Sequence, residues 1–294
     1  ADLSASDTAF LKELVFGVFR NRILLDYIIR KNSSIRLKKI DPQILNILRM
    51  GAYQVLFMDK VPSRAAVNES VNLAKVNKSN FAASMVNAVL RRVSENGIRL
   101  PDEDEKSIGY LSVKYSCPEW LLSLWVDSYG IDNAIFLAEK ALEAAPLVIR
   151  CNTTKITVDN LISKHADEGV VAEKSTVLPD ALILKSTNAI DELDAYKNGL
   201  FHVQDIASQI CCKALNPEPG DVVFDLCSAP GGKTFTMAEM MENSGTIRAF
   251  DIYQSRVELI RNGASRLGLT NVYSYLSDAA IFNENYGTAD KILC

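Results

Sequence analysis

Three acidic side chains and a glycine-rich turn in the last third of the sequence have types and spacing that suit nucleoside binding. The run VVFDLCSAPGGKT, residues 222–234, joins an apolar stretch to a helix-forming stretch through that turn. Asp225 lies just before the turn, and Asp251 and Asp278 follow the next two apolar stretches. A strand, a tight turn and a helix in this order begin a doubly wound α/β fold, whose ligands bind at the carboxyl ends of the strands. The pattern therefore predicts a ligand crevice beside this turn.

The spacing of the glycines argues against two common nucleotide loops. A phosphate-binding Walker loop needs a glycine five positions before Gly232, where this chain has Cys227. A dinucleotide loop needs G-x-G-x-x-G, whereas Gly231 and Gly232 are adjacent and follow Pro230. What remains is a turn that can wrap an amino-acid or adenosyl group, since glycine lets the backbone approach a ligand closely.

Two of the acids indicate what the ligand carries. Asp251 follows Gly232 by 19 positions, where a doubly wound fold places an acid on the ribose hydroxyls. Asp278 ends the next strand, where it can accept a hydrogen bond from an adenine amino group. Either acid alone could instead cap a helix, and Asp225 could orient the loop or simply end its strand. Together they favour a ligand with a ribose, an adenine and no pyrophosphate, which is S-adenosylmethionine.

Composition and periodicity divide the chain into four parts, of which three precede the crevice. Residues 1–97 carry apolar residues at helical spacing, which predicts an all-α helical bundle. Residues 98–145 open with the polar run IRLPDEDE and are interpreted as a linker and helical connector. Residues 146–200 are predicted to form a small α+β subdomain, with strands at Leu147–Cys151 and Thr176–Leu184 and helices at Val158–His165 and Ile190–Tyr196.

Residues 201–294 form the fourth part, in which strands alternate with helices of about ten residues. This alternation predicts a parallel sheet and a Rossmann-like α/β domain. A strand beginning near Phe201 is counted with this domain, followed by strands at Val222–Cys227, Thr246–Phe250, Val272–Leu276 and Lys291–Cys294. With so few strands we expect the doubly wound domain to be incomplete.

Charge is distributed unevenly along the chain, whose formal net charge is −4. Residues 1–100 contain 16 basic and 8 acidic residues, and residues 101–294 contain 16 basic and 28 acidic residues. A basic N-terminal third suits a polyanionic partner, although a solvated helix surface would look the same. The side chains that could contact phosphates include Arg20, Arg22, Lys38, Lys39, Arg91 and Arg92.

Composition argues against two further classes of protein. No apolar run approaches the roughly 18–20 residues that a membrane span needs. The six cysteines include no C-x-x-C pair and the chain has only two histidines, so no metal site is predicted. Reduced thiols in a cytoplasmic protein are the simplest interpretation.

Three strings in the first hundred residues resemble a NusB-like RNA-binding domain: LVFGVFRNRILLDYII, ILRMGAYQVLFMDKVPSRAAVNESVNLAK and MVNAVLRRV. More narrowly, they resemble the version that opens the Sun/Fmu (RsmB-type) 16S rRNA methyltransferases. The α+β part resembles the ferredoxin-like subdomain of RNA cytosine-5 methyltransferases, and GLFHVQD at 199–205 resembles the motif that leads into their catalytic domain. The resemblance implies a 16S rRNA partner, and we expect a monomer.

The string DLCSAPGGKT, residues 225–234, resembles the cofactor motif of the same family. AFD at 249–251 with Arg256 resembles its ribose motif, and RLG at 266–268 followed by Asp278 resembles its adenine motif. The resemblance implies that S-adenosylmethionine is held by Cys227, Ser228, Ala229, Pro230, Gly231, Gly232, Lys233, Asp251, Arg256 and Asp278.

The chain departs from the family in its cysteines. The family adds a cysteine thiolate to C6 of cytosine so that C5 can accept the methyl group, and uses cysteines of a Thr-Cys and an Asp-x-Pro-Cys motif. Neither motif occurs here, and DKILC at 290–294 resembles the strand that precedes Asp-x-Pro-Cys. We therefore assign no catalytic residue, expect the nucleophile beyond Cys294, and predict cofactor binding without methyl transfer. The alternative is a non-catalytic NusB-like RNA-binding protein with a vestigial methyltransferase half.

Overall fold

The computed structural model describes residues 3–77, 80–186 and 189–294. It forms two compact units, Ala1–Ala144 and Ala145–Cys294, which are treated separately below. Among the described residues, no helix combines the length and the apolar character that crossing a membrane would require.

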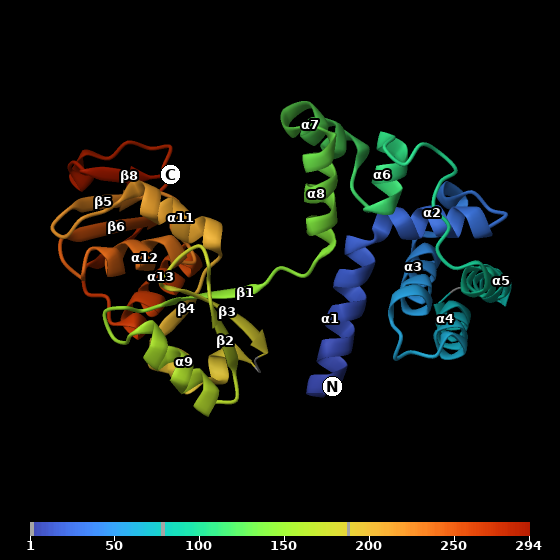
Figure 1. The fold of residues 1–294 in the computed structure, drawn as a ribbon, viewed down its shortest axis with the longest axis horizontal. Coiled ribbons are helices and arrows are strands. Elements are labelled where there is room, and N and C mark those ends of the chain that lie inside the picture. Colours follow the sequence, from blue (N-terminus) through green and yellow to red (C-terminus); the bar gives the residue numbers. More distant parts are fainter. Residues whose placement is uncertain (1–2, 78–79, 187–188) are drawn as a thin grey trace. The chain divides into compact units, whose positions relative to one another are not determined.

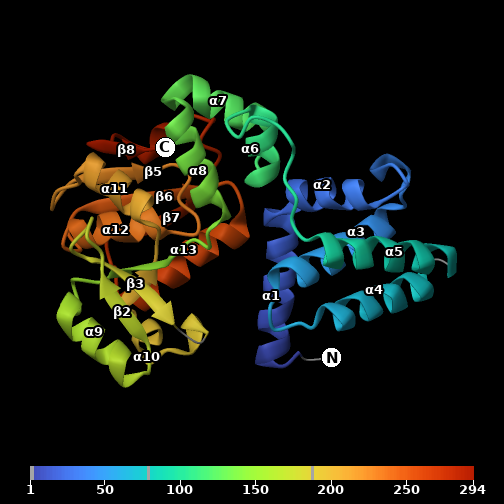
Figure 2. The ribbon, with the colours of Figure 1, turned by 45° about the vertical axis from the view of Figure 1, so that its right-hand side comes forward.

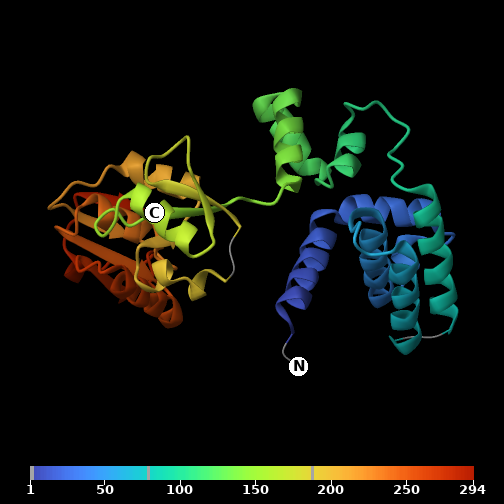
Figure 3. The ribbon, with the colours of Figure 1, turned by 60° about the horizontal axis from the view of Figure 1, so that its bottom comes forward.

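The first unit opens with a bundle of α-helices. Side-chain caps begin two of them, since Ser4 accepts from the backbone N–H of Asp7 and Asp41 accepts from that of Gln43. Figures 2 and 3 show α4 and α5 running side by side, with α2 crossing the bundle. The elements are α1 (Ala5–Arg20), α2 (Arg22–Asn32), the 3₁₀ turn η1 (Leu37–Lys39), α3 (Pro42–Phe57), α4 (Ser63–Asn77) and α5 (Asn80–Asn96).

The core of the bundle is aliphatic, and Leu25, Ile29, Leu48 and Leu90 are wholly buried in it. Most of the apolar side chains of α1 lie outside this core, because only Leu14 among them is buried. A smaller cluster around Leu111, Leu122 and Ala138 joins three further helices. These are α6 (Ile108–Lys114), α7 (Glu119–Tyr129) and α8 (Ile131–Leu142).

The second unit begins with an antiparallel sheet in the order β2-β3-β1-β4 (Figure 1). Its core contains Ile149, Leu161, Leu182 and Phe201, all fully buried. This is the predicted α+β subdomain. Its elements are β1 (Leu147–Cys151), α9 (Val158–Asp167), β2 (Val171–Lys174), β3 (Ala181–Ser186), the 3₁₀ turn η2 (Ile190–Glu192), α10 (Asp194–Lys197) and β4 (Phe201–Val203).

Three predictions for this subdomain were wrong in detail. Phe201–Val203, counted with the cofactor domain, pairs antiparallel with β1 and so belongs to the smaller sheet. The strand predicted from Thr176 begins only at Ala181, because Ser175 to Asp180 form the turn of a hairpin whose first strand, β2, was missed. The helix predicted over Ile190–Tyr196 is a 3₁₀ turn followed by one short α-helix.

A parallel sheet in the order β7-β6-β5-β8 forms the rest of the second unit (Figure 1). Val223, Ile247 and Ala249 on one face of it pack against the helices, whereas Phe224, Phe250 and Tyr275 lie on the other face. The elements are α11 (Ile206–Leu215), β5 (Val222–Asp225), α12 (Gly232–Met240), β6 (Thr246–Asp251), α13 (Gln254–Leu267), β7 (Val272–Leu276), the 3₁₀ turn η3 (Glu284–Tyr286) and β8 (Lys291–Leu293). The predicted fold class is therefore confirmed.

Candidate cofactor site

The glycine-rich turn leaves the carboxyl end of β5, which lies between β6 and β8 in the parallel sheet, and leads directly into α12. Asp225, the last residue of β5, is buried and its carboxylate accepts a hydrogen bond of 2.6 Å from the Thr234 hydroxyl. Burial raises the pKa of Asp225, and the Thr234 hydrogen bond partly offsets this. Asp225 thus links the two ends of the turn, in agreement with an orienting role.

Ser228 fastens the middle of the turn to the neighbouring strand. Its backbone N–H and its hydroxyl each donate to the carbonyl oxygen of Phe250 in β6, both at 2.9 Å. The backbone N–H of Leu226 donates to Leu293 in β8 at 2.9 Å. The turn is therefore anchored to the strands on both sides of β5.

The two adjacent glycines do different work. Gly231 has φ +113°, and a Cβ placed there would lie 2.2 Å from the Phe235 ring, so only glycine fits. A Cβ on Gly232 would lie 3.6 Å from the Gln204 side chain, which is ordinary contact. Gly232 lines the cavity described next and Gly231 does not. Gly231 thus shapes the turn, and Gly232 leaves room beside it.

A cavity of about 220 Å³ lies against the turn. Six of the ten predicted cofactor residues line it, namely Cys227, Ser228, Ala229, Pro230, Gly232 and Lys233. Its other wall comes from Val203, Gln204, Asp205 and Ser208, at β4 and the start of α11. These four were not predicted as site residues, although the string GLFHVQD had marked the segment.

Gln204 is the informative member of that wall. Its side chain is buried, and its carbonyl oxygen accepts a 2.6 Å hydrogen bond from the Thr236 hydroxyl. Its amide nitrogen is also buried but has no hydrogen-bond partner among the described residues. Because an unpartnered buried donor is costly, this nitrogen suits a ligand that brings an acceptor.

The remaining predicted cofactor residues lie at the ends of the next two strands. Asp251 ends β6 and is buried; one carboxylate oxygen accepts from the backbone N–H of Tyr253 at 3.1 Å, and the other has no partner among the described residues. Asp278 follows β7, is half-buried, and lines a separate cavity of about 390 Å³ with Phe224 and Phe250. Arg256 is exposed and lies over the Tyr253 ring. The three acids thus share one edge of the sheet, as predicted.

Two cysteines of the second unit, Cys151 and Cys212, are buried thiols. Burial raises the pKa values of Cys151 and Cys212 to about 12, so both stay protonated near neutral pH. Cys227 and Cys294 are exposed, and no cysteine of the chain forms a disulfide. Cys212 is completely buried in the hydrophobic core beside the parallel sheet, so it is a packing residue.

The predicted RNA contacts fall into separate groups. Arg20 and Arg22 flank the junction of α1 and α2, while Lys38 and Lys39 lie in η1 beyond the other end of α2. Arg91 and Arg92 are exposed on α5, and Arg92 donates to the carbonyl oxygen of Asn32, the last residue of α2, at 3.1 Å. The length of α2, about 15 Å at 1.5 Å per residue, separates the first group from the contact made by Arg92.

Comparison with known families gives three matches along the chain. Residues 1–95 match the NusB family, residues 117–191 match the ferredoxin-like domain of RsmF/B-like methyltransferases, and residues 212–294 match the 16S rRNA methyltransferase RsmB/F family. The probable ribosomal RNA small subunit methyltransferase B of Bacillus subtilis is 34% identical over 99% of this chain. The chain therefore carries, in this order, a NusB domain, an RsmF/B-like ferredoxin-like domain and an RsmB/F methyltransferase domain.

A further relative and two solved structures are also similar to this chain. The corresponding Synechocystis protein is 34% identical over 94% of this chain. The chain spans 65% of the length of the Bacillus relative and 62% of the Synechocystis relative. The crystal structure of PH0851 superposes on 98% of this chain and 65% of its own, with a TM-score of 0.78 and 26% identity. A methyltransferase homolog from Pyrococcus horikoshii covers 62% of this chain and 60% of its own, with a TM-score of 0.56 and 30% identity.

Proposed function

We propose that this chain carries the RNA-binding and cofactor-binding parts of an enzyme that methylates C5 of a cytosine in 16S rRNA. The cofactor is S-adenosylmethionine, which when bound supplies an electrophilic methyl group. The observation that carries the proposal is the anchored turn at residues 226–231 beside a buried acid, Asp251, that keeps one carboxylate oxygen free. The match of residues 212–294 to the 16S rRNA methyltransferase RsmB/F model supports the choice of 16S rRNA, and the motif resemblance supports C5 of cytosine.

Each part of the site has a task in this proposal. The Asp251 carboxylate accepts hydrogen bonds from the ribose hydroxyls, and Asp278 accepts from the adenine amino group. The unpartnered amide nitrogen of Gln204 donates to an acceptor on the amino-acid end of the cofactor, beside Gly232. The cavity against the turn, at about 220 Å³, is small enough that it takes only this end. A structure of Pyrococcus horikoshii NSun6 with SFG shares the fold, at 21% identity and a TM-score of 0.51.

The test of the site is cofactor affinity measured by calorimetry. We expect Asp251→Asn to weaken binding of S-adenosylmethionine about tenfold, because a buried hydrogen-bond acceptor pair contributes roughly 1.5–3 kcal/mol. Glu258→Gln is the matched control, since Glu258 is an exposed acid on α13 in the same domain. Equal affinities for the wild type and Asp251→Asn would show that Asp251 does not bind the cofactor.

We also propose that these 294 residues bind the cofactor without transferring its methyl group. Carbon 5 of cytosine is a poor nucleophile until a thiolate adds to C6, and no Thr-Cys or Pro-Cys pair occurs in this sequence. Transfer of tritiated methyl groups to 16S rRNA by this chain would contradict the proposal. The expectations of a monomer and of a cytoplasmic location stay predictions.

A further inference from the structure

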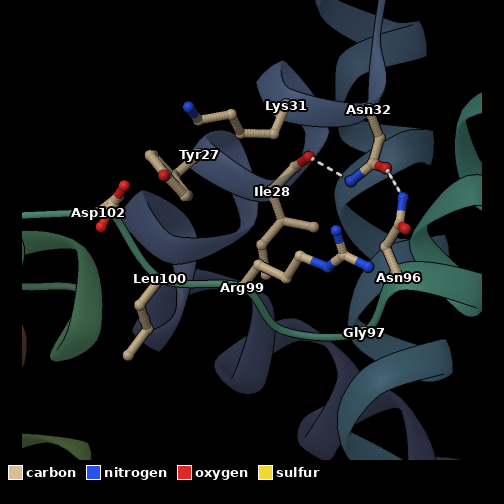
Figure 4. A pocket seen from close by; sticks show the side chains of 9 residues that line it. All are labelled: Tyr27, Ile28, Lys31, Asn32, Asn96, Gly97, Arg99, Leu100 and Asp102. Carbon is tan, nitrogen blue, oxygen red and sulfur yellow. Dashed lines mark hydrogen bonds between the residues drawn. The ribbon is translucent and has the colours of Figure 1, made fainter.

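A third cavity, of about 300 Å³, lies in the first unit, where α2 and α5 end and the chain leaves α5 (Figure 4). Tyr27 and Lys31 of α2 line one side, and Arg99 and Leu100 line the other. Tyr27, Arg99 and Leu100 were not among the predicted RNA contacts. The cavity lies wholly within the first unit, and it is separate from the cofactor site.

Two asparagines close the inner end of this cavity. The Asn32 amide nitrogen donates to the carbonyl oxygen of Ile28 at 2.9 Å, and its amide oxygen accepts from the Asn96 amide nitrogen at 2.7 Å (Figure 4). The Arg92 guanidinium donates a hydrogen bond to the backbone carbonyl oxygen of Asn32. These bonds fix the end of α2 against α5. They also leave the Asn96 amide oxygen as an acceptor without a partner among the described residues.

Two exposed cations, Lys31 and Arg99, line the cavity from different sides (Figure 4). Lys31 and Arg99 are exposed and form no ion pair within the described part of the chain. Lys31 and Arg30 lie over the Tyr27 ring, at 5.5 and 5.3 Å from its centroid, so the ring holds two cations beside the opening. Asp102 also lines the cavity and is the one acid to do so. The net charge of the side chains around the opening is therefore positive.

We infer that this cavity binds one nucleotide of single-stranded RNA, with its phosphate on Lys31 and Arg99 and its base inside. The inference rests on the proposed RNA-binding function of the first unit and assigns it a definite contact. A volume of about 300 Å³ is at the lower end for ligand pockets, and it admits a base splayed from a single strand but no duplex.

The interior suits a base better than an anion. The cavity lies at the C-terminal ends of α2 and α5, where helix carbonyls carry partial negative charge and disfavour a phosphate. The same carbonyls and the Asn96 oxygen favour the amino group of cytosine, adenine or guanine. Ile28 and Leu100 supply the apolar walls that a base would contact. Cations at the mouth and acceptors inside match the two ends of a nucleotide.

Two variants separate the charge of the mouth from the shape of the interior. Fluorescence anisotropy of the 294-residue chain with a labelled single-stranded RNA of about ten nucleotides gives the affinity. We expect Arg99→Gln to weaken binding about fivefold and to lower the salt slope by about one, because one phosphate contact is lost. Leu100→Trp fills the cavity without changing charge, so it should weaken binding by a similar factor and keep the salt slope. Lys60→Ala, at an exposed lysine between α3 and α4, is the matched control.

Three outcomes would overturn the inference. The first is an affinity of Arg99→Gln and Leu100→Trp equal to that of Lys60→Ala. The second is an equal loss of affinity in Arg99→Gln and Leu100→Trp when the probe is a duplex RNA. The third is a mononucleotide that binds the chain as tightly as the oligonucleotide does. Thermal melting checks that Leu100→Trp folds. If it does not fold, the result for Arg99→Gln alone tests the inference, because Arg99 is exposed and its replacement should not disturb folding. Calorimetry with S-adenosylmethionine reports on the cofactor site separately, so a failure there is distinct from a failure of this cavity.

Discussion

Ser228 and Phe250 are joined by two hydrogen bonds to one oxygen atom: the backbone N–H and the hydroxyl of Ser228 both lie 2.9 Å from the Phe250 carbonyl oxygen. Phe250 directly precedes Asp251 at the end of β6. The bonds therefore hold the glycine-rich turn at a set distance from the acid proposed to bind ribose. The site is organised before any ligand arrives, which lowers the entropy cost of binding.

Removing one of these two bonds should affect both stability and affinity. Ser228→Ala loses the hydroxyl bond and keeps the backbone one, so we expect the free energy of unfolding to fall by about 1 kcal/mol. Affinity for S-adenosylmethionine should fall severalfold, because the turn is less firmly placed. Urea denaturation and calorimetry measure the two effects. Ser265→Ala, at an exposed serine of α13, should change neither, and an unchanged affinity in Ser228→Ala would show that this anchor is dispensable.

The adjacent glycines should separate folding from binding. Gly231→Ala forces a side chain into the left-handed region and against Phe235, which should cost roughly 1–3 kcal/mol of folding free energy or more. Gly232→Ala meets ordinary contact and should fold like the wild type, but its methyl group enters the cavity and should weaken cofactor binding. Thermal melting and calorimetry distinguish the two. A Gly232→Ala variant that binds normally would mean that the cofactor does not approach this glycine.

The sequence predicted the parallel sheet well because its strands are apolar and separated by helices with clear ends, such as Gly268 after α13. It failed at two strands of the antiparallel sheet. β2 is an exposed edge strand that carries Glu173 and Lys174, so it has no apolar pattern to find. Phe201–Val203 was assigned to the wrong sheet because a short strand does not reveal its pairing partner. Only tertiary contacts decide that.

A buried charge cluster ties the antiparallel sheet to α12. Arg150 of β1 donates to Glu239 at 2.8 Å, both side chains are buried, and His202 of β4 lies 3.4 Å from the same carboxylate. We expect Glu239→Leu to cost about 3–5 kcal/mol in urea denaturation, because it leaves Arg150 buried with only a weak partner. The double variant Arg150→Met with Glu239→Leu should be more stable than Glu239→Leu alone.

A surface pair provides the control for that prediction. Lys174 lies 2.6 Å from Asp159, and both side chains are exposed. Lys174→Ala should change the free energy of unfolding by less than about 1 kcal/mol. If Glu239→Leu costs no more than this surface variant, the cluster does not hold the two sheets together.

Stability should depend on pH through His165, which is fully buried against Phe201 and has no hydrogen bond on either ring nitrogen within the described chain. Burial lowers the pKa of His165 below 6.5, and Glu168 at 3.8 Å only partly offsets this. The folded state thus prefers the neutral ring. Stability is therefore complete above the unfolded pKa of about 6.5 and is lost as the pH falls below it.

His165→Leu should remove this dependence. Chemical denaturation at pH values from about 7.5 to 5.5 should show a decline for the wild type and a flatter profile for the variant, because the variant lacks the imidazole that the folded state keeps neutral. If the stability of the wild type and that of His165→Leu change in parallel with pH, protonation of His165 does not destabilise the folded state.

The sequence identified the turn and the acids of the candidate site because doubly wound folds place ligands at strand ends. It missed Gln204, whose importance depends on an unpartnered buried nitrogen that only the three-dimensional structure shows. It also grouped basic residues that α2 keeps apart, since spacing along the chain does not give distance across a bundle.

The most direct test of the account is a calorimetric titration of the 294-residue chain with S-adenosylmethionine, with ATP and NAD⁺ titrated in parallel. The anchored turn, Asp251 and Asp278 predict saturable binding of one S-adenosylmethionine per chain and no binding of ATP or NAD⁺. Absence of S-adenosylmethionine binding, or equal binding of either nucleotide, would contradict it.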